Sequence, residues 1–206
     1  MGRPETDQLR LGAMQQLGSG LSVANHHEDV LAVKEANLST LRRVGASEEN
    51  ILAVQSNLAT TYQEIGRHEE AVVLQRDVYS GSLRLRGEEH IDALQAALNY
   101  ANSLRDLQRF EEARSLLREY MPVARRILGA GHDHTLRMRT IYATALFLAD
   151  GATLDDLREA LTTLEETERT ARRVLGGAHP TTEIAVVCLE RSREVLRARK
   201  TPAESA

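Results

Sequence analysis

Apolar side chains recur at every third or fourth position along most of the chain. In one well-defined stretch the recurring positions are Ile91, Leu94, Leu98, Ala101, Leu104 and Leu107. An α-helix completes a turn in about 3.6 residues, so this spacing places them along one helix face. A second stripe holds Ala113, Leu116, Leu117 and Tyr120 and ends at Gly129. The pattern predicts two amphipathic helices, with the chain turning at Gln108 and Arg109.

The predicted helix pair repeats along the chain. One motif aligns Val30, Ala71, Ala113 and Ala160, at spacings of 41, 42 and 47 residues. A second motif ends each unit with a glycine, and three of these glycines open a Gly-x-x-His step that ends at His90, His132 and His179. Two motifs with one period are hard to obtain by chance. The sequence therefore predicts units over about 8–45, 46–87, 88–129 and 130–176, a capping helix over about 181–199 and a frayed tail over 200–206.

These units predict the fold class. A helix pair of this size buries too little apolar surface to fold alone, and neighbouring pairs supply the missing contacts when they stack. A small constant rotation between pairs gives the stack a concave inner wall. We therefore expect an all-α fold, a right-handed α-solenoid of antiparallel helix pairs, formed by residues 1–206 as a single domain with a C-terminal capping helix.

Glycine, asparagine and proline refine the expected turns. Gly66 and Asn25 stand where Gln108 turns the later unit, and both residue types tolerate the left-handed conformation that ends a helix. Pro122 lies inside a predicted helix and has no backbone donor. We therefore expect a kink or break near Tyr120–Met121.

The unit 130–176 is longer than the others, and its five extra residues fall around residues 150–152. Thr153 and Asp156 follow directly. A threonine three residues before an acid is typical of a helix N-cap, so we expect this pair to cap the next helix.

Composition limits the function classes. Five Tyr, two Phe and no Trp disfavour an all-β fold. No apolar run approaches the roughly 18 residues of a membrane span, and no signal-peptide core is present, so neither a membrane-bound nor a secreted protein is expected. The single cysteine, Cys188, fits a reducing compartment and hence a cytoplasmic location. A net charge of −4 without a basic block argues against nucleic-acid binding.

The repeat motif resembles a known family. The pattern Asn57-Leu58-Ala59-x-x-Tyr62-x-x-x-Gly66-Arg67-His68-Glu69-Glu70-Ala71 is similar to the tetratricopeptide repeat (TPR). The 42-residue period, with its closing Arg172-Arg173-Val174-Leu175-Gly176, resembles the long-helix variant found in kinesin light chains. The resemblance covers residues from about 8 to 199. It implies stacked helix pairs and a role in binding other proteins.

The resemblance also implies where a partner binds. In the proteins that the chain resembles, the first helix of each pair lines the groove and carries the ligand contacts. The matching face here holds Asn57, Thr60, Gln63, Asn99, Asn102, Arg105, Arg137, Ile141, Thr144 and Phe147. Carboxamides suit the main chain of a peptide, and guanidinium groups suit a carboxylate. We therefore expect a non-enzymatic scaffold that binds a peptide segment of a protein partner, without a cofactor.

Three alternatives stay open at this point. Asn57 and Asn99 have a second interpretation, as hydrogen-bonding groups that hold adjacent helices together. The second alternative is a self-associating solenoid that acts as an oligomerisation module, because open ends of a stack expose apolar faces and favour a homo-oligomer. A histidine-based metal hydrolase is the third.

The histidines argue against the hydrolase. His132-Asp133-His134 with His179, and further His90, superficially form a metal set. However, His90, His132 and His179 recur at the repeat period, which places them a helix pair apart, whereas zinc ligands converge within about 2 Å of the ion. We therefore expect these histidines to stabilise loops, and we assign no catalytic, cofactor-binding or metal-binding residues.

Overall fold

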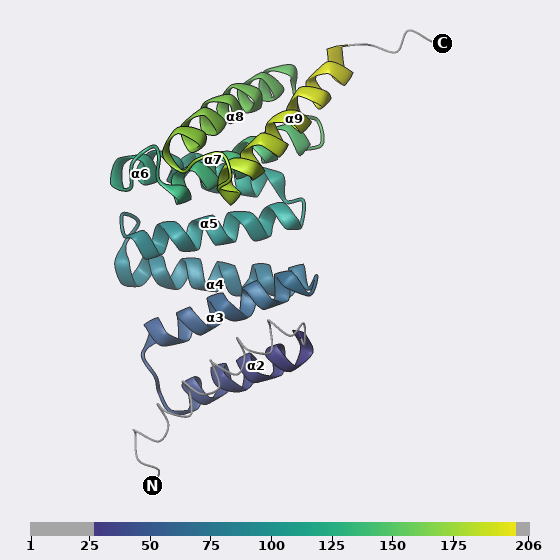
Figure 1. Cartoon of the computed structure of the whole chain (residues 1–206). Helices are drawn as coiled ribbons and strands as arrows, with labels where there is room; N and C mark the ends of the chain where they lie inside the picture. The colour runs from purple at the N-terminus through teal and green to yellow at the C-terminus, as the bar shows by residue number, and fades with distance from the viewer. Residues whose placement is uncertain (1–26, 201–206) are drawn as a thin grey trace. The chain divides into compact units, whose positions relative to one another are not determined.

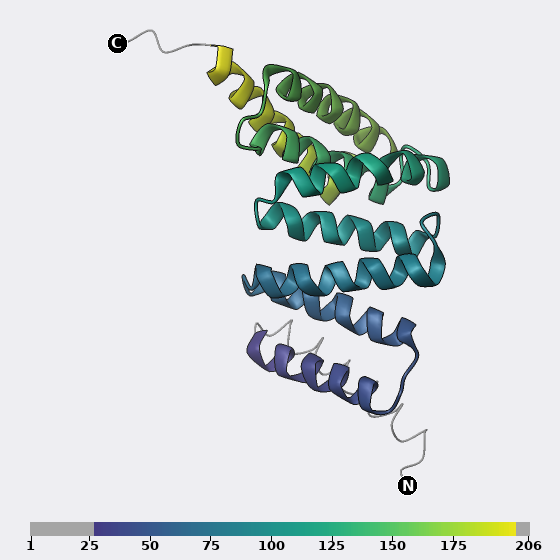
Figure 2. The same cartoon turned by 180° about the vertical axis from the view of Figure 1, so that it is seen from behind.

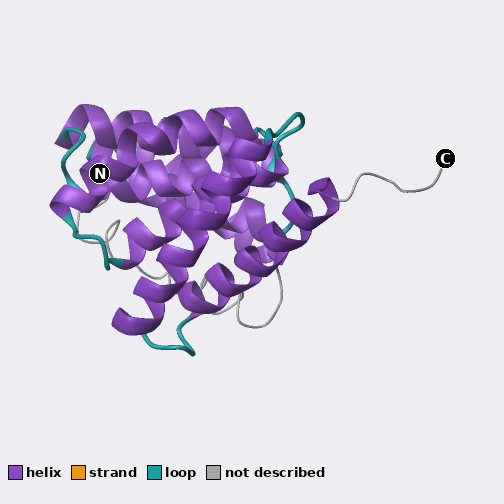
Figure 3. Ribbon diagram, turned by 90° about the horizontal axis from the view of Figure 1, so that it is seen from above, coloured by secondary structure: helices purple, strands orange, loops and turns teal. Residues whose placement is uncertain are grey.

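The structure, a computed structural model, describes residues 27–200. Eight helices and no strand lie in this range (Figure 3). They are α2 (His27–Arg43), α3 (Glu48–Glu64), α4 (His68–Arg86), α5 (Ile91–Asp106), α6 (Phe110–Ile127), α7 (Asp133–Leu148), α8 (Leu154–Val174) and α9 (Pro180–Lys200). The predicted all-α fold of helix pairs is confirmed. The first helix of the first predicted unit, the turn at Asn25 and tail residues 201–206 lie outside the described residues.

The helix pattern of the sequence matches the observed bounds closely. The helices α5 and α6 cover the two stripes of the unit 88–129, and α9 covers the capping helix expected over 181–199. One boundary differs, because Lys200 was assigned to the tail and is the last residue of α9.

The described helices fall into two compact units, with their boundary at Leu85–Arg86 in the last turn of α4. The first unit contains α2, α3 and α4 (Figure 1). Its core joins Leu31, Leu38 and Leu41 of α2 to Val54, Leu58 and Tyr62 of α3 and to Ala71 of α4. These are positions of the apolar stripes, so burial of the stripes holds the three helices together. Continuity of a single solenoid across the boundary stays a prediction.

In the second unit, α7 is the central helix. It packs against α5, α6, α8 and α9, as the two opposite views show (Figures 1 and 2). From Thr135 to Phe147 every side chain of α7 is buried except Arg137 and Arg139, which are partly exposed. A helix surrounded by neighbours needs apolar or small residues on all sides, and α7 has them. No helix between residues 27 and 200 has the length and apolar character needed to cross a bilayer.

The predicted turns and caps are confirmed, with one correction. Gly66 and Gln108 both adopt a positive φ, of 79° and 59°. Thr153 and Asp156 form a reciprocal capping box at the start of α8. Of the kink or break expected near Tyr120–Met121, the break is wrong, since α6 runs unbroken through Pro122; a kink there stays a prediction. Proline costs a helix interior about 3 kcal/mol, and burial of the fully enclosed Leu117 and Tyr120 on the apolar face of α6 offsets this cost.

Candidate functional site

Three helices of the second unit meet around a small pocket. α7 packs against both α5 and α9, and the pocket between them has a volume of about 130 Å³. Its lining residues are Asn102, Arg105, Arg137, Thr140, Ile141, Thr181 and Ile184. Polar and charged groups thus share one small cavity with two isoleucines, and we call this cavity the α5–α7–α9 site.

On the α5 wall, two polar side chains hold the same carboxylate. Arg105 donates from Nε and Nη2 to Oδ1 of Asp106, at 3.2 and 2.7 Å. Asn102 donates from Nδ2 to Oδ2 of Asp106, at 3.4 Å. These bonds fix the orientation of Asn102 and Arg105. A guanidinium carries five N–H groups, so Arg105 retains donors beyond the two that Asp106 uses.

On the opposite wall, Asp133 joins the first turns of α7 and α9. The hydroxyl of Thr181 donates to Oδ1 of Asp133. Arg137 stands one turn along α7, and its Nη1 lies 3.9 Å from Oδ2 of Asp133. This separation exceeds hydrogen-bond distance. Because the Arg137 side chain is also 41% exposed, its guanidinium is the most available donor in the pocket.

The remaining wall is apolar. Ile141 of α7 is buried, and Ile184 of α9 is half exposed. Between them, the hydroxyl of Thr140 donates to the carbonyl of Leu136 within α7, so Thr140 presents mainly its methyl group. The α5–α7–α9 site therefore combines guanidinium and carboxamide donors with a small apolar surface, and it contains no group placed to act as a nucleophile.

Comparison with known proteins agrees with this architecture. Residues 50–126 match the family model of the tetratricopeptide repeat. Residues 50–126 therefore carry tetratricopeptide repeats. Proteins built of these repeats are generally interaction scaffolds rather than enzymes. No curated protein sequence matches the chain.

Solved structures share the TPR fold. A kinesin-light-chain-like protein of Podosopora anserina with nearly identical TPR-like repeats is 20% identical, with a TM-score of 0.77 over 97% of this chain and 91% of that one. BtubC from P. vanneervenii is 16% identical, with a TM-score of 0.62 over 98% and 89% of the two chains. MamA RS-1 is 11% identical, with a TM-score of 0.54 over 93% and 97%. At such identities the likeness concerns the fold.

The TPR helices bring together four of the ten residues expected to form the groove. These are Asn102, Arg105, Arg137 and Ile141. Asn99 lies one turn from Asn102, and its Oδ1 accepts a hydrogen bond from Nε2 of Gln95 within α5, at 2.8 Å. This bond lies within one helix, unlike the inter-helix bond considered for Asn99. Oδ1 of Asn99 is therefore already engaged, and Asn99 lies beside the pocket without lining it.

Two other expected groove residues are buried in the interior of the second unit. Phe147 is 4% exposed and Thr144 is 8% exposed. The hydroxyl of Thr144 donates to the carbonyl of Thr140 and lies 3.6 Å from Sγ of Cys188 on α9. Because α9 packs directly on α7, it covers Thr144. Phe147 is not part of the pocket wall beside Ile141.

The three expected residues of the first unit lie on α3. Asn57 and Thr60 are exposed and Gln63 is partly buried. The hydroxyl of Thr60 donates to the carbonyl of Ser56. Lys34 of α2 donates to the Asn57 carbonyl at 3.3 Å. The lysine therefore holds α2 to α3, and burial lowers its pKa. None of the three expected residues lines the pocket found between α2, α3 and α4.

Sequence reasoning missed the contribution of α9. Arg137 follows His132 by five residues, and Ile184 follows His179 by the same number. The repeat register therefore places Ile184 at the same position of its helix as Arg137. Thr181 and Ile184 were not expected in the groove because the last helix, which has no partner helix, was predicted to be a cap.

The recurrent histidines stabilise the loops, as expected. Nδ1 of His90 accepts a hydrogen bond from the backbone N–H of Asp92. Nδ1 of His132 and of His179 likewise accepts from the backbone N–H of the residue two positions later. Each histidine thus caps the helix that follows. Among the described residues, no three His, Cys, Asp or Glu side chains are grouped to hold a metal ion.

Proposed function

We propose that this TPR chain is a protein-interaction scaffold and that the α5–α7–α9 site holds a peptide segment of its partner. The observation that carries the proposal is the convergence of Asn102, Arg105 and Arg137 with an apolar wall in one pocket. A carboxamide pairs with peptide main-chain groups, and a guanidinium pairs with a carbonyl or carboxylate. The isoleucines supply a place for one apolar side chain.

The charge balance of the site favours a peptide that is not strongly acidic. Arg105 is already paired with Asp106, and Arg137 faces Asp133. The two carboxylates offset the two guanidinium groups, so the pocket has little net charge. We therefore expect hydrogen bonds to main-chain carbonyls, with at most one carboxylate on Arg137, to set the orientation of the peptide.

Preorganisation makes such a small site useful. Asp106 fixes Asn102 and Arg105, and Asp133 fixes Thr181, before a partner arrives, so little ordering cost falls on these side chains. A few hydrogen bonds and one buried apolar side chain then suffice for an affinity in the micromolar range, about −8 kcal/mol. Additional contacts along the same face would strengthen it.

The test removes the two side chains that are most available to a ligand. Partners captured by pull-down are mapped on peptide arrays, and binding is measured for the wild type and for the double variant Asn102→Ala with Arg137→Ala. We expect binding to be lost while helicity and melting temperature stay nearly unchanged. Arg43→Ala, at an exposed position in the last turn of α2, is the matched control. Binding by the double variant at wild-type affinity would refute the assignment.

A second candidate function is self-association through α9. Ile184 and Val187 are 50% and 63% exposed, and their three-residue spacing places them on one helix face. Packing of this face on a second copy would bury both. Light scattering at several concentrations tests the idea: mass should rise with concentration for the wild type and stay constant for Val187→Glu. A wild type that is monomeric throughout this range excludes self-association.

A further inference from the structure

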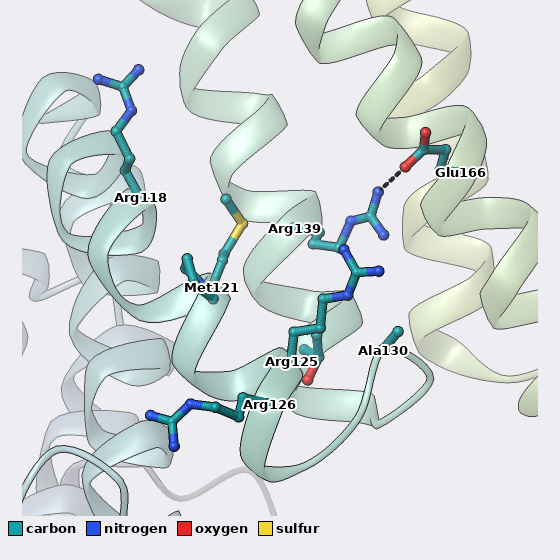
Figure 4. Close-up of a pocket in the computed structure, with 9 residues that line it drawn as sticks. Arg118, Met121, Arg125, Arg126, Ala130, Arg139 and Glu166 are labelled. Atoms are coloured by element: carbon teal, nitrogen blue, oxygen red, sulfur yellow. Dashed lines mark hydrogen bonds and ion pairs between the residues drawn. The ribbon is translucent and has the colours of Figure 1, made fainter.

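A second pocket lies on different residues of the second unit. It opens between α6 and α8, with α7 beneath it, and has a volume of about 570 Å³ (Figure 4). Four arginines line it, Arg118, Arg125, Arg126 and Arg139, together with one acid, Glu166. It shares no lining residue with the α5–α7–α9 site. We call it the arginine pocket.

Carboxylates compensate only part of this positive charge. Nη2 of Arg139 lies 2.6 Å from Oε2 of Glu166, and Nη2 of Arg126 lies 2.8 Å from Oε1 of Glu89. Arg118 donates to the phenol oxygen of Tyr142 at 3.4 Å. The side chain of Arg125 makes no hydrogen bond or ion pair with the described residues. The pocket therefore has spare guanidinium donors and a net positive charge.

Two of the arginines are placed to act on one anion. Arg125 comes from α6 and Arg139 from α7, and Figure 4 shows both side chains extending toward α8. Arg118 and Arg126 extend in other directions (Figure 4). Glu166 is bonded to Arg139 and leaves Arg125 without a counter-charge. An anion with two oxygens would pair with both guanidinium groups and reduce their mutual repulsion.

The rest of the wall favours a peptide over a small inorganic anion. Met121, Pro122 and Ala130 give the pocket an apolar surface. Phosphate would use the arginines alone, whereas an acidic peptide with a neighbouring apolar residue would use both the arginines and this apolar surface.

We propose that the arginine pocket binds an acidic segment of a partner protein. A glutamate or aspartate of the segment pairs with Arg125 and Arg139, and an apolar side chain next to it packs on Met121 and Pro122. This is a second contact surface of the scaffold. It shares α7 with the α5–α7–α9 site but has different lining residues, and it does not depend on a ligand there.

The experiment uses the full chain and a defined peptide array. The array holds capped 12-residue peptides with Glu or Asp one to three residues from Leu, Phe or Met, and a counterpart set in which Gln or Asn replaces each acid. Three proteins are compared: the wild type, Arg125→Glu and the charge-matched control Arg43→Glu. Because Arg125 is exposed and has no described partner, its replacement should leave the melting temperature nearly unchanged.

We expect the wild type and Arg43→Glu to bind acidic peptides in preference to their amide counterparts, and Arg125→Glu to bind them about tenfold more weakly. Binding should also weaken with added salt, since the contacts are near the surface. Equal binding of acid and amide peptides, or acidic binding that survives Arg125→Glu, would overturn the proposal. Displacement by inorganic phosphate at concentrations equal to the peptide would assign the pocket to a phosphate group instead.

The two proposals fail separately. A peptide that is lost with Asn102→Ala and Arg137→Ala but retained with Arg125→Glu belongs to the α5–α7–α9 site. The opposite result assigns it to the arginine pocket. Comparing these variants therefore shows which of the two site assignments is wrong and leaves the other assignment unaffected.

Discussion

At the level of single residues, the turns between paired helices each contain one residue with a positive φ. Gly66 and Gln108 are the turn residues of the two units. The backbone N–H of each donates to the carbonyl three positions before it, and the N–H of the next residue donates to the carbonyl five positions before that residue. The turn residue must adopt the left-handed conformation in this arrangement. Glycine does so without steric cost, whereas a residue with a Cβ loses roughly 1–2 kcal/mol.

Gln108→Gly should therefore stabilise the protein. Relief of the strain at φ 59° exceeds the greater entropy that glycine loses on folding, so we expect a gain of about 0.5–1 kcal/mol in the free energy of unfolding. Urea denaturation followed by circular dichroism measures it. Gly66→Ala is the reciprocal control and should lose about 1 kcal/mol. A loss of stability in Gln108→Gly would contradict this account.

His134 is expected to make the stability depend on pH. Burial lowers its pKa from the ordinary 6.5, and the neighbouring His132 adds to this effect. Nδ1 of His134 is buried without a partner among the described residues, so the fold favours the neutral ring. The unfolded chain therefore takes up its proton first as the pH falls, and stability drops from about pH 6.5 down to the lower pKa of the folded state.

His134→Phe should remove this part of the pH dependence while keeping an aromatic ring in place. The measurement compares melting temperatures of the variant and the wild type between pH 7.5 and 5. The difference between the two proteins isolates His134 from other titrating groups. Parallel curves for the two proteins would show that His134 does not contribute.

Among the helices, the capping box of α8 compensates for the long connection that precedes it. The backbone N–H of Thr153 donates to Oδ2 of Asp156, and the N–H of Asp156 donates to Oγ1 of Thr153. Arg114 of α6 lies 3.3 Å from Oδ1 of Asp156. The cap thus fixes the start of α8 against α6 and sets one wall of the space in which the arginine pocket lies.

Thr153→Ala should destabilise the protein by about 1 kcal/mol, because the backbone N–H of Asp156 loses its acceptor, Oγ1 of Thr153. The bonds from Thr153 lower the pKa of Asp156 from its ordinary 3.8. The carboxylate of Asp156 therefore contributes its full stabilisation of the fold above pH 3.8, and this stabilisation is lost as the pH falls through the lower pKa of the folded state. Chemical denaturation at pH 7 and pH 3 tests both points. An unchanged midpoint for Thr153→Ala at pH 7 would show that solvent satisfies the end of α8 equally well.

Helix bounds were predictable because their causes are local. The stripe from Ile91 to Leu107, the glycines before His132 and His179, and the Thr153–Asp156 pair each act within a few residues of the chain. Pro122 was misjudged because the cost of a missing donor is local, whereas the packing of Tyr120 that offsets it depends on neighbouring helices. Burial, unlike capping, depends on contacts between helices that are far apart in the sequence.

For the molecule as a whole, the sites depend on contacts that are distant along the chain. The α5–α7–α9 site joins residues from 102 to 184, and the arginine pocket joins residues from 118 to 166. The repeat register predicted the first site in part, because equivalent positions face the same way. No register relates Arg125 to Arg139, so the arginine pocket was not predictable from spacing. The burial of Thr144 beneath α9 was not predictable for the same reason.

The central position of α7 predicts how stability is distributed over the second unit. Its residues from Thr135 to Phe147 are almost entirely buried, and four helices pack on it. Amide hydrogens in such a helix exchange only when its neighbours separate. Hydrogen exchange followed by mass spectrometry should therefore find the slowest exchange of this unit in α7, with faster exchange in the exposed half of α9. Equal protection of α7 and α9 would contradict this ranking.

A pair of leucines tests the same distribution by mutation. Leu146 of α7 is fully buried, whereas Leu154 at the start of α8 is 43% exposed. Leu146→Ala leaves a cavity among several helices and should cost about 3 kcal/mol, while Leu154→Ala should cost under about 1 kcal/mol. Denaturant midpoints give both values. Because α7 contributes to both pockets, Leu146→Ala should also weaken binding at each site, whereas Leu154→Ala should leave both unchanged. Equal losses for the two variants would mean that α7 is not the helix on which the unit depends.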